Sequence, residues 1–255
     1  MSDSDSEFKL KNPPIVEVVL DIDCDFPPSF DLTEVEGSLR DALRETYPKL
    51  HQQLMQEHRI EATETEAKHA VRHTRQALQF LTADEKQLVQ ARIGGFSFNR
   101  LTPYTGLDDY MAEIERTWSI FVGLAKPVAI RRVSLRTINR LVLPIEENER
   151  VNLGRYIKNA PKLPDEDGMD GTGFLTQYSA VEKGSQNGLT VVLTTQPVEG
   201  KGFPIIFDID VSVEEVSLDE PSDWLGITKI IKSLRSLKNR VFKNTLTQEC
   251  LSLYQ

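Results

Sequence analysis

Two acidic stretches contain the first residues that could carry chemistry. Asp21 and Asp23 alternate with apolar residues in the stretch that starts at Ile15, and Asp208 and Asp210 do the same near the other end of the chain. In an extended strand, residues two apart project from one face at steps of ~6.6 Å. Two such strands side by side could hold Mg²⁺ through oxygen ligands and orient the phosphates of a nucleotide. The alternative, which we favour, is that these aspartates form the solvated face of an antiparallel sheet, since no glycine-rich phosphate loop lies near either stretch.

A second set of candidates lies in the stretch Val128–Leu143. Arg132, Arg136 and Arg140 are four residues apart, so they share one face if this stretch is a strand. Guanidinium groups offer paired donors to carboxylate or phosphate, and these arginines together with Asn139 are the predicted binding residues for a small anion. Alternatively, the arginines pair across the sheet with the aspartates as a ladder, with ~0.2–1 kcal/mol for each pair. Asn139 falls on the opposite, apolar face and needs hydrogen-bond partners if it is buried.

A third candidate is a basic helix near the C-terminus. Its polar side carries six basic residues and no acidic residue: Lys229, Lys232, Arg235, Lys238, Arg240 and Lys243. A basic amphipathic helix can bind nucleic acid, anionic lipid or an acidic protein. The chain as a whole has 30 Lys and Arg against 39 Asp and Glu, a formal net charge of −9, which argues against a dedicated nucleic-acid binder. The helix is therefore expected to contact the protein's own acidic body or a partner protein.

Other kinds of reactive site lack support. The two cysteines, Cys24 and Cys250, provide neither a disulfide framework nor a zinc site. His69 and His73 have the spacing of a helical ligand pair, but no glutamate of a zinc-protease motif lies between them. We therefore predict no cofactor and no catalytic set.

The composition is that of a folded protein of the cytoplasm. Hydrophobic residues make up 39% of the 255 residues and charged residues 27%, so the chain can bury a core. It contains no apolar run of the ~18–20 residues that a membrane span requires, and the N-terminus does not have the pattern of a secretion signal. We expect an acidic disordered tail over residues 1–10 and a single domain over residues 11–255.

The hydrophobic pattern predicts strands separated by a few helices. Strands are expected at 15–26, 70–82, 87–101, 128–143, 174–183, 189–196 and 203–213, and helices at 31–47, 107–124, 153–159 and 224–246. Residues 52–68 are polar and are either a loop or a solvated helix. Asn187-Gly188, between the strands 174–183 and 189–196, predicts a tight two-residue turn. The class is therefore α+β, with a largely antiparallel twisted sheet and about three main helices on one face. The two Asp-Ile-Asp stretches are weakly similar in sequence. The chain could therefore consist of two related halves, 11–144 and 145–255.

Four stretches together resemble a known family. They are Asn12–Glu17 (NPPIVE), Ser134–Arg140 (SLRTINR), Phe207–Val211 (FDIDV) and Phe242–Thr247 (FKNTLT). Their order and spacing resemble a sporadically distributed, uncharacterised family of bacterial proteins of about this length, over Lys11 to Thr247. The resemblance implies no activity, cofactor or catalytic residue. The patchy distribution of such a family suggests accessory roles such as phage defence or toxin neutralisation.

These observations lead to one main hypothesis and two alternatives. The main hypothesis is a non-enzymatic cytoplasmic interaction protein that binds a partner protein or a second copy of itself. The first alternative is a metal- or nucleotide-dependent enzyme built on the paired aspartate strands. The second is a binder of a small anionic ligand on the arginine-bearing face of the sheet.

Overall fold

The structure is a computed structural model that describes residues 10–62, 67–145, 151–163, 168–169, 171–197 and 202–255. Within these ranges nine strands form one sheet in the order β2-β3-β4-β5-β1-β6-β9-β8-β7. Every pair of neighbouring strands is antiparallel. The predicted α+β class with an antiparallel sheet is confirmed. The expected tail at 1–10 lies, apart from Leu10, outside the described residues.

The elements have the following bounds. The strands are β1 (Ile15–Asp25), β2 (Lys49–Ala62), β3 (Ala67–Leu81), β4 (Gln87–Arg92), β5 (Gly95–Leu101), β6 (Ala129–Pro144), β7 (Leu175–Val181), β8 (Gly188–Thr195) and β9 (Gly202–Glu214). The helices are α1 (Leu32–Leu43), the 3-10 helix η2 (Leu107–Tyr110), α2 (Met111–Ala125), α3 (Leu153–Tyr156), α4 (Trp224–Thr245) and α5 (Gln248–Ser252).

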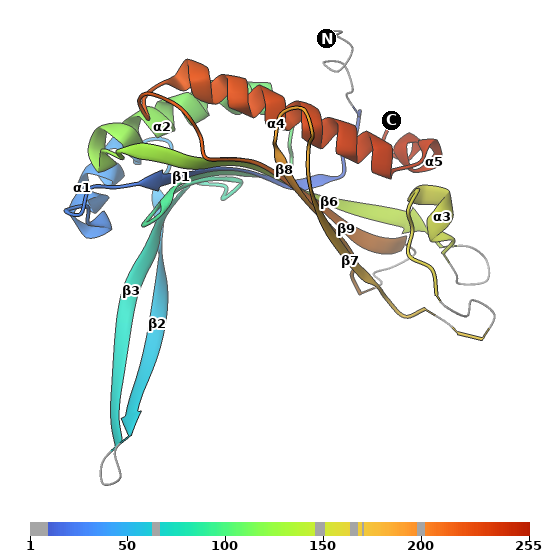
Figure 1. Cartoon of the computed structure of the whole chain (residues 1–255), viewed down its shortest axis with the longest axis horizontal. Coiled ribbons are helices and arrows are strands. Elements are labelled where there is room, and N and C mark those ends of the chain that lie inside the picture. The colour runs from blue at the N-terminus through green and yellow to red at the C-terminus, as the bar shows by residue number, and fades with distance from the viewer. Residues whose placement is uncertain (1–9, 63–66, 146–150, 164–167, 170, 198–201) are drawn as a thin grey trace.

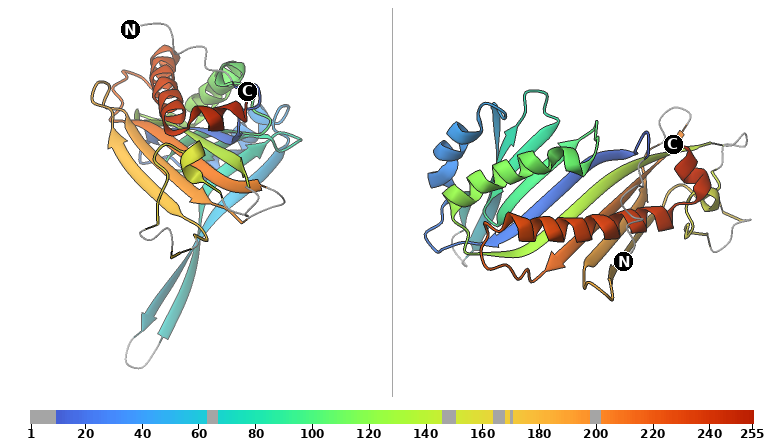
Figure 2. Two further views of the ribbon diagram at one scale, coloured as in Figure 1. Left: turned by 90° about the vertical axis from the view of Figure 1, so that its right-hand side faces the viewer. Right: turned by 90° about the horizontal axis from the view of Figure 1, so that it is seen from above.

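The three long helices cover one face of the sheet and leave the other face open (Figure 1). α1 and α2 lie over the first half of the sheet and α4 over the second, as the view from above in Figure 2 shows. The hairpin of β2 and β3 projects far from the body on the side of the open face. No helix in the described part of the chain is long and apolar enough to cross a membrane.

A similar order of elements occurs twice along the chain, with four strands after α1 in the first run and three after α3 in the second. β1, α1, β2 to β5 and α2 are followed by β6, α3, β7 to β9 and α4. In each run the first strand pairs with the last one, β1 with β5 and β6 with β9, and β1 pairs with β6 at the centre of the sheet. The second run begins at β6, and the halves 11–144 and 145–255 stay a prediction. Since β1 corresponds to β6 in this scheme, the Asp-Ile-Asp similarity between β1 and β9 does not join equivalent strands.

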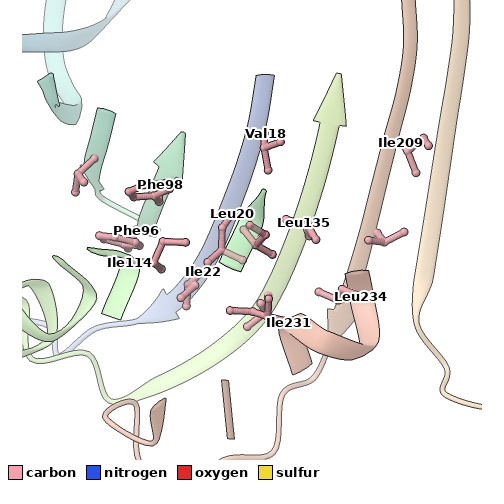
Figure 3. Close-up of a cluster of buried hydrophobic side chains, with 14 of the residues drawn as sticks. Val18, Leu20, Ile22, Phe96, Phe98, Ile114, Leu135, Ile209, Ile231 and Leu234 are labelled. Atoms are coloured by element: carbon pink, nitrogen blue, oxygen red, sulfur yellow. The ribbon is translucent and has the colours of Figure 1, made fainter. Parts of the chain in front are cut away.

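The core lies between the helices and the covered face of the sheet (Figure 3). Alternate residues of β1 point into it, and Val18, Leu20 and Ile22 are all buried. Trp118 of α2 and Leu234 of α4 close the core from above. Burial of each large aliphatic or aromatic side chain contributes about 1.5–3 kcal/mol, so this layer fixes which face of the central strands is covered.

Three local predictions were wrong. The segment 52–68 was expected to be a loop or a helix, but its described residues, 52–62 and 67–68, belong to β2 and β3. The expected strand 87–101 is a hairpin of two strands with Ile93 and Gly94 at its turn. Asn187-Gly188, expected to form a two-residue turn, lies at the end of a longer connection in which Gln186 has a positive φ of 63°. In the first case the polar β2 has exposed residues on both faces, so no alternation marks it.

Candidate functional site

The structure separates the two aspartate strands. β1, which carries Asp21 and Asp23, and β9, which carries Asp208 and Asp210, lie on opposite sides of β6. Two strand spacings amount to about 9.5 Å, so the carboxylates do not meet at one point. In the described ranges no group of three or more His, Cys, Asp or Glu residues is placed to hold a metal ion. The arrangement gives no support to the predicted metal or nucleotide site.

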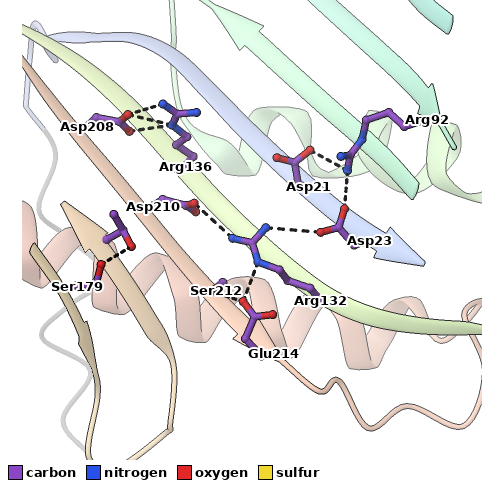
Figure 4. Close-up of polar contacts among 11 residues, drawn as sticks. Asp21, Asp23, Arg92, Arg132, Arg136, Ser179, Asp208, Asp210, Ser212 and Glu214 are labelled. Atoms are coloured by element: carbon purple, nitrogen blue, oxygen red, sulfur yellow. Dashed lines mark hydrogen bonds and ion pairs between the residues drawn. The ribbon is translucent and has the colours of Figure 1, made fainter. Parts of the chain in front are cut away.

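The aspartates instead form ion pairs with arginines across the open face (Figure 4). We call this set the charge ladder; its members are Asp21, Asp23, Arg92, Arg132, Arg136, Asp208, Asp210 and Glu214. Arg132 is at its centre, with nitrogen–oxygen distances of 2.8 Å to Glu214, 3.3 Å to Asp210 and 3.7 Å to Asp23. A single guanidinium thus links carboxylates of both neighbouring strands, as the cross-strand alternative predicted.

The outer arginines complete the ladder. Arg92 lies 3.1 Å from Asp21 and 2.9 Å from Asp23. Arg136 makes a bidentate contact with Asp208, with its closest nitrogen 2.5 Å from the carboxylate. Because carboxylates already occupy the forks of Arg132 and Arg136, an external anion would have to displace them.

Three serines on the open face leave room for the side chains of the charge ladder. Ser97, Ser134 and Ser212 lie in one row across β5, β6 and β9, with Asp21 of β1 between the first two. They point to the open face, yet Ser97 and Ser134 are each only 1% exposed. Small side chains in this row leave room for the long charged side chains of the flanking rows to lie over the sheet.

The remaining predicted binding residues lie elsewhere. Arg140 donates from Nε to Oε1 of Gln196 at 3.1 Å. Asn139 is buried on the helix-covered face, as expected, and its Nδ2 donates to the carbonyl oxygens of Phe207 at 2.9 Å and Thr137 at 3.3 Å. The structure therefore does not bring Asn139 together with the three arginines.

The basic helix contacts the protein's own body. Arg235 lies 2.7 Å from Asp108, and Arg240 forms an ion pair with Glu182. Lys238 lines a cavity under α4 together with Arg235, and it differs from both arginines because it forms no ion pair with a described residue. Sequence reasoning grouped Lys238 with the exposed lysines, although its position four residues after Leu234 and four before Phe242 places it on the inward side of the helix.

The cysteines do not supply a nucleophile. Cys24 and Cys250 are both buried and unpaired. Burial raises the pKa of each thiol to about 12, so both stay protonated at neutral pH.

Asp210 offers a test of what the ladder contributes. One of its oxygens, Oδ1, is buried without a hydrogen-bond partner in the described residues. Burial raises the pKa of Asp210 above its ordinary value of 3.8, although Arg132 and Arg136 act against this shift. In the folded state the proton is thus held more tightly than in the unfolded chain. The contribution of Asp210 to stability falls as the pH rises through the window from 3.8 to the raised value.

We therefore expect Asp210→Asn to unfold at pH 7 with a free energy equal to or above that of the native protein. At pH 4, where a larger fraction of the folded native carboxyl is protonated than at pH 7, the two proteins should be closer to each other. Urea unfolding at both pH values measures this difference. Asp25→Asn is the control, since the Asp25–Arg131 pair is exposed and worth about 0–1 kcal/mol. A loss of stability at pH 7 that disappears at pH 4 would contradict the expectation.

Comparison with known proteins adds no functional information. No protein-family model matches this chain, and no curated protein matches it. The function therefore has to be inferred from the geometry of the molecule itself.

Proposed function

We propose that this protein is a non-enzymatic interaction protein that pairs with a second copy of itself through the free edge of β7. The observation that carries the proposal is an uncharged, exposed strand at the end of the sheet. β7 is the last strand in the sheet order and pairs only with β8 among the described residues. Its sequence, LTQYSAV, contains no charged residue in a chain of which 27% is charged.

The outer edge of β7 presents backbone groups suited to strand pairing. Two backbone hydrogen bonds at the ends of β7 show which of its residues bond to β8. The N–H of Thr195 donates to the carbonyl of Phe174 at 3.2 Å, and the N–H of Glu182 donates to the carbonyl of Asn187 at 2.9 Å. In an antiparallel ladder, the residues that bond to one neighbour alternate with residues whose N–H and C=O groups face away. The odd-numbered residues, Leu175, Gln177, Ser179 and Val181, therefore direct these groups outward.

The side chains do not protect this edge. Natural edge strands are commonly blocked by a lysine, a proline, a bulge or a covering element. β7 instead has Leu175 70% exposed and Val181 60% exposed. An unprotected edge of seven residues with two exposed apolar side chains favours pairing with another strand.

The sequence of β7 is compatible with itself as a partner. In an antiparallel pair centred on Tyr178, Leu175 of one copy lies opposite Val181 of the other, and Gln177 lies opposite Ser179. All four outward-facing residues then exchange backbone hydrogen bonds, and no like charges meet. This complementarity favours a second copy over an unrelated partner and leaves the hairpin and the open face of both copies accessible.

Sedimentation or light scattering over a range of protein concentrations tests the proposal. We expect a reversible rise from the monomer mass of 28.9 kDa to twice that mass. The double variant Leu175→Lys/Val181→Lys places lysines opposite each other and should weaken the dimer about tenfold or more.

The control variant is Leu225→Lys/Val128→Lys. Leu225 is 67% exposed and Val128 61% exposed, and both lie outside β7, so the residue types, exposure and added charge are matched. The control should dimerise like the native protein. A native protein that stays monomeric at every concentration, or a control that loses the dimer equally, would overturn the proposal.

A further inference from the structure

We propose that the cavity under α4 binds a small organic carboxylate that carries a hydroxyl or amine donor next to its carboxylate group. The cavity has a volume of about 130 Å³. It lies between α4, the chain that leads into β1, Asn139 of β6 and the connection from β5 to η2. This site is separate from the charge ladder, which is on the opposite face of the sheet.

Three of the four stretches that the sequence analysis singled out line this cavity, and the other one packs against a lining residue. Pro13 and Pro14 line it from the first stretch, Asn139 from the second and Phe242 from the fourth. Phe207 of the third stretch stacks on Phe242 with ring centroids 5.6 Å apart. The proposed function uses none of these residues.

Lys238 supplies a cation without a protein counter-ion. No described residue forms a hydrogen bond or an ion pair with it, and α4 carries no acidic residue. Arg235, the other cation of the lining, contacts Asp108 at 2.7 Å. A partly buried ammonium group without a carboxylate partner is best stabilised by an anion that enters the cavity.

Asn139 supplies a hydrogen-bond acceptor. Its Nδ2 donates to the carbonyls of Phe207 and Thr137, which fixes the orientation of the amide. Its Oδ1 has no hydrogen-bond donor among the described residues. A ligand that satisfies both Lys238 and Asn139 thus needs an anionic group and an O–H or N–H donor.

The walls and the volume limit the size of the ligand. Pro13, Pro14, Tyr104 and Phe242 provide apolar surface between the polar groups. A cavity of ~150 Å³ holds benzene, which has six heavy atoms. A short hydroxy acid or amino acid fits this limit, and a nucleotide does not.

The protonation of Lys238 makes binding depend on pH. Burial, together with the nearby Arg235, lowers the pKa of Lys238 to about 8. The other charged or titratable groups around the cavity are Arg235, Tyr104, and Asp108 and Asp109 of η2. Lys238 therefore loses its charge between pH 7 and 9, whereas burial raises the pKa of Tyr104 further above this range. Affinity should therefore be nearly constant between about pH 5 and 7, where the ligand is ionised, and fall as the pH rises past 8.

Glycolate is the probe, because it combines a carboxylate with an adjacent hydroxyl in five heavy atoms. Saturation-transfer NMR and calorimetry on the full chain should detect binding at pH 7, with affinity lower at pH 9 by about tenfold. Glycolamide, a neutral molecule of the same size, should bind at least tenfold more weakly.

Lys238→Met removes the charge and keeps the length of the side chain, and it should weaken glycolate binding about tenfold or more. Lys232→Met is the control on the exposed side of the same helix and should bind like the native protein. The pH and glycolamide comparisons use the native chain, so they remain decisive if Lys238→Met fails to fold. The proposal is overturned if glycolate does not bind, if glycolamide binds equally, or if both variants lose binding to the same extent.

Discussion

Gly95→Ala is expected to destabilise the protein by about 3 kcal/mol or more. Gly95 begins β5 and has a φ of 149°, a conformation that residues with a side chain rarely adopt. A methyl group at this position would lie 2.1 Å from the carbonyl oxygen of Ile22 and 2.9 Å from the Cα of Asp23. Both obstacles are backbone atoms of the central strand β1, so relief of the clash would require β1 and β5 to move apart.

Gly94→Ala is a matched control one residue away. A methyl group at Gly94 meets no atom within 4 Å, so this variant should unfold within about 1 kcal/mol of the native protein. Urea unfolding followed by circular dichroism measures both variants. If Gly95→Ala is as stable as Gly94→Ala, the close approach of the β4–β5 hairpin to β1 is wrong.

Trp118→Ala should lower the free energy of unfolding by about 3–5 kcal/mol. Trp118 is 1% exposed and lies in the middle of α2, with ring centroids 5.5 Å from Phe96 and 5.7 Å from Phe121. Its Nε1 also donates to the carbonyl of Pro221 at 3.1 Å, which ties α2 to the segment before α4. The substitution therefore opens a cavity and leaves a carbonyl oxygen without its donor.

The second tryptophan provides the comparison. Trp224 is only partly buried at the start of α4, so Trp224→Ala should cost less than half as much. Each variant keeps one tryptophan, whose fluorescence reports unfolding alongside circular dichroism. Equal losses for the two variants would contradict the central position assigned to Trp118.

The hydrophobic periodicity of the sequence predicted those elements that have one buried face and one solvent-exposed face. The alternation in β1 correctly placed Leu20 and Ile22 inside and Asp21 and Asp23 outside. The opposite charges on β1, β6 and β9 likewise allowed a cross-strand ladder to be anticipated, because period-two spacing fixes which side chains share a face.

Contacts between distant segments could not be predicted in this way. The neighbours of β6 depend on strand order, which periodicity does not encode, so the sequence left the ladder and the metal site as alternatives. β2 was missed because Gln52, Gln53 and Leu54 are all exposed in succession, which removes the alternation. The cavity joins Pro13, Asn139 and Lys238, and only the packing of α4 on the sheet brings them together.

The projecting hairpin has a consequence for the cooperativity of unfolding. In the part of the chain that the structure describes, β3 pairs with β4 only over Ala77–Leu81, and β2 pairs with no strand other than β3. Arg75, opposite Leu54, still reaches Glu36 of α1 at 2.7 Å, and beyond this pair the described residues of the ribbon form backbone pairs only with each other. The amide protons of the ribbon should exchange with solvent through local opening. Those of β1 and β6 should exchange only when the whole sheet opens. The ribbon can thus change its sequence or order on a partner with little effect on the stability of the body.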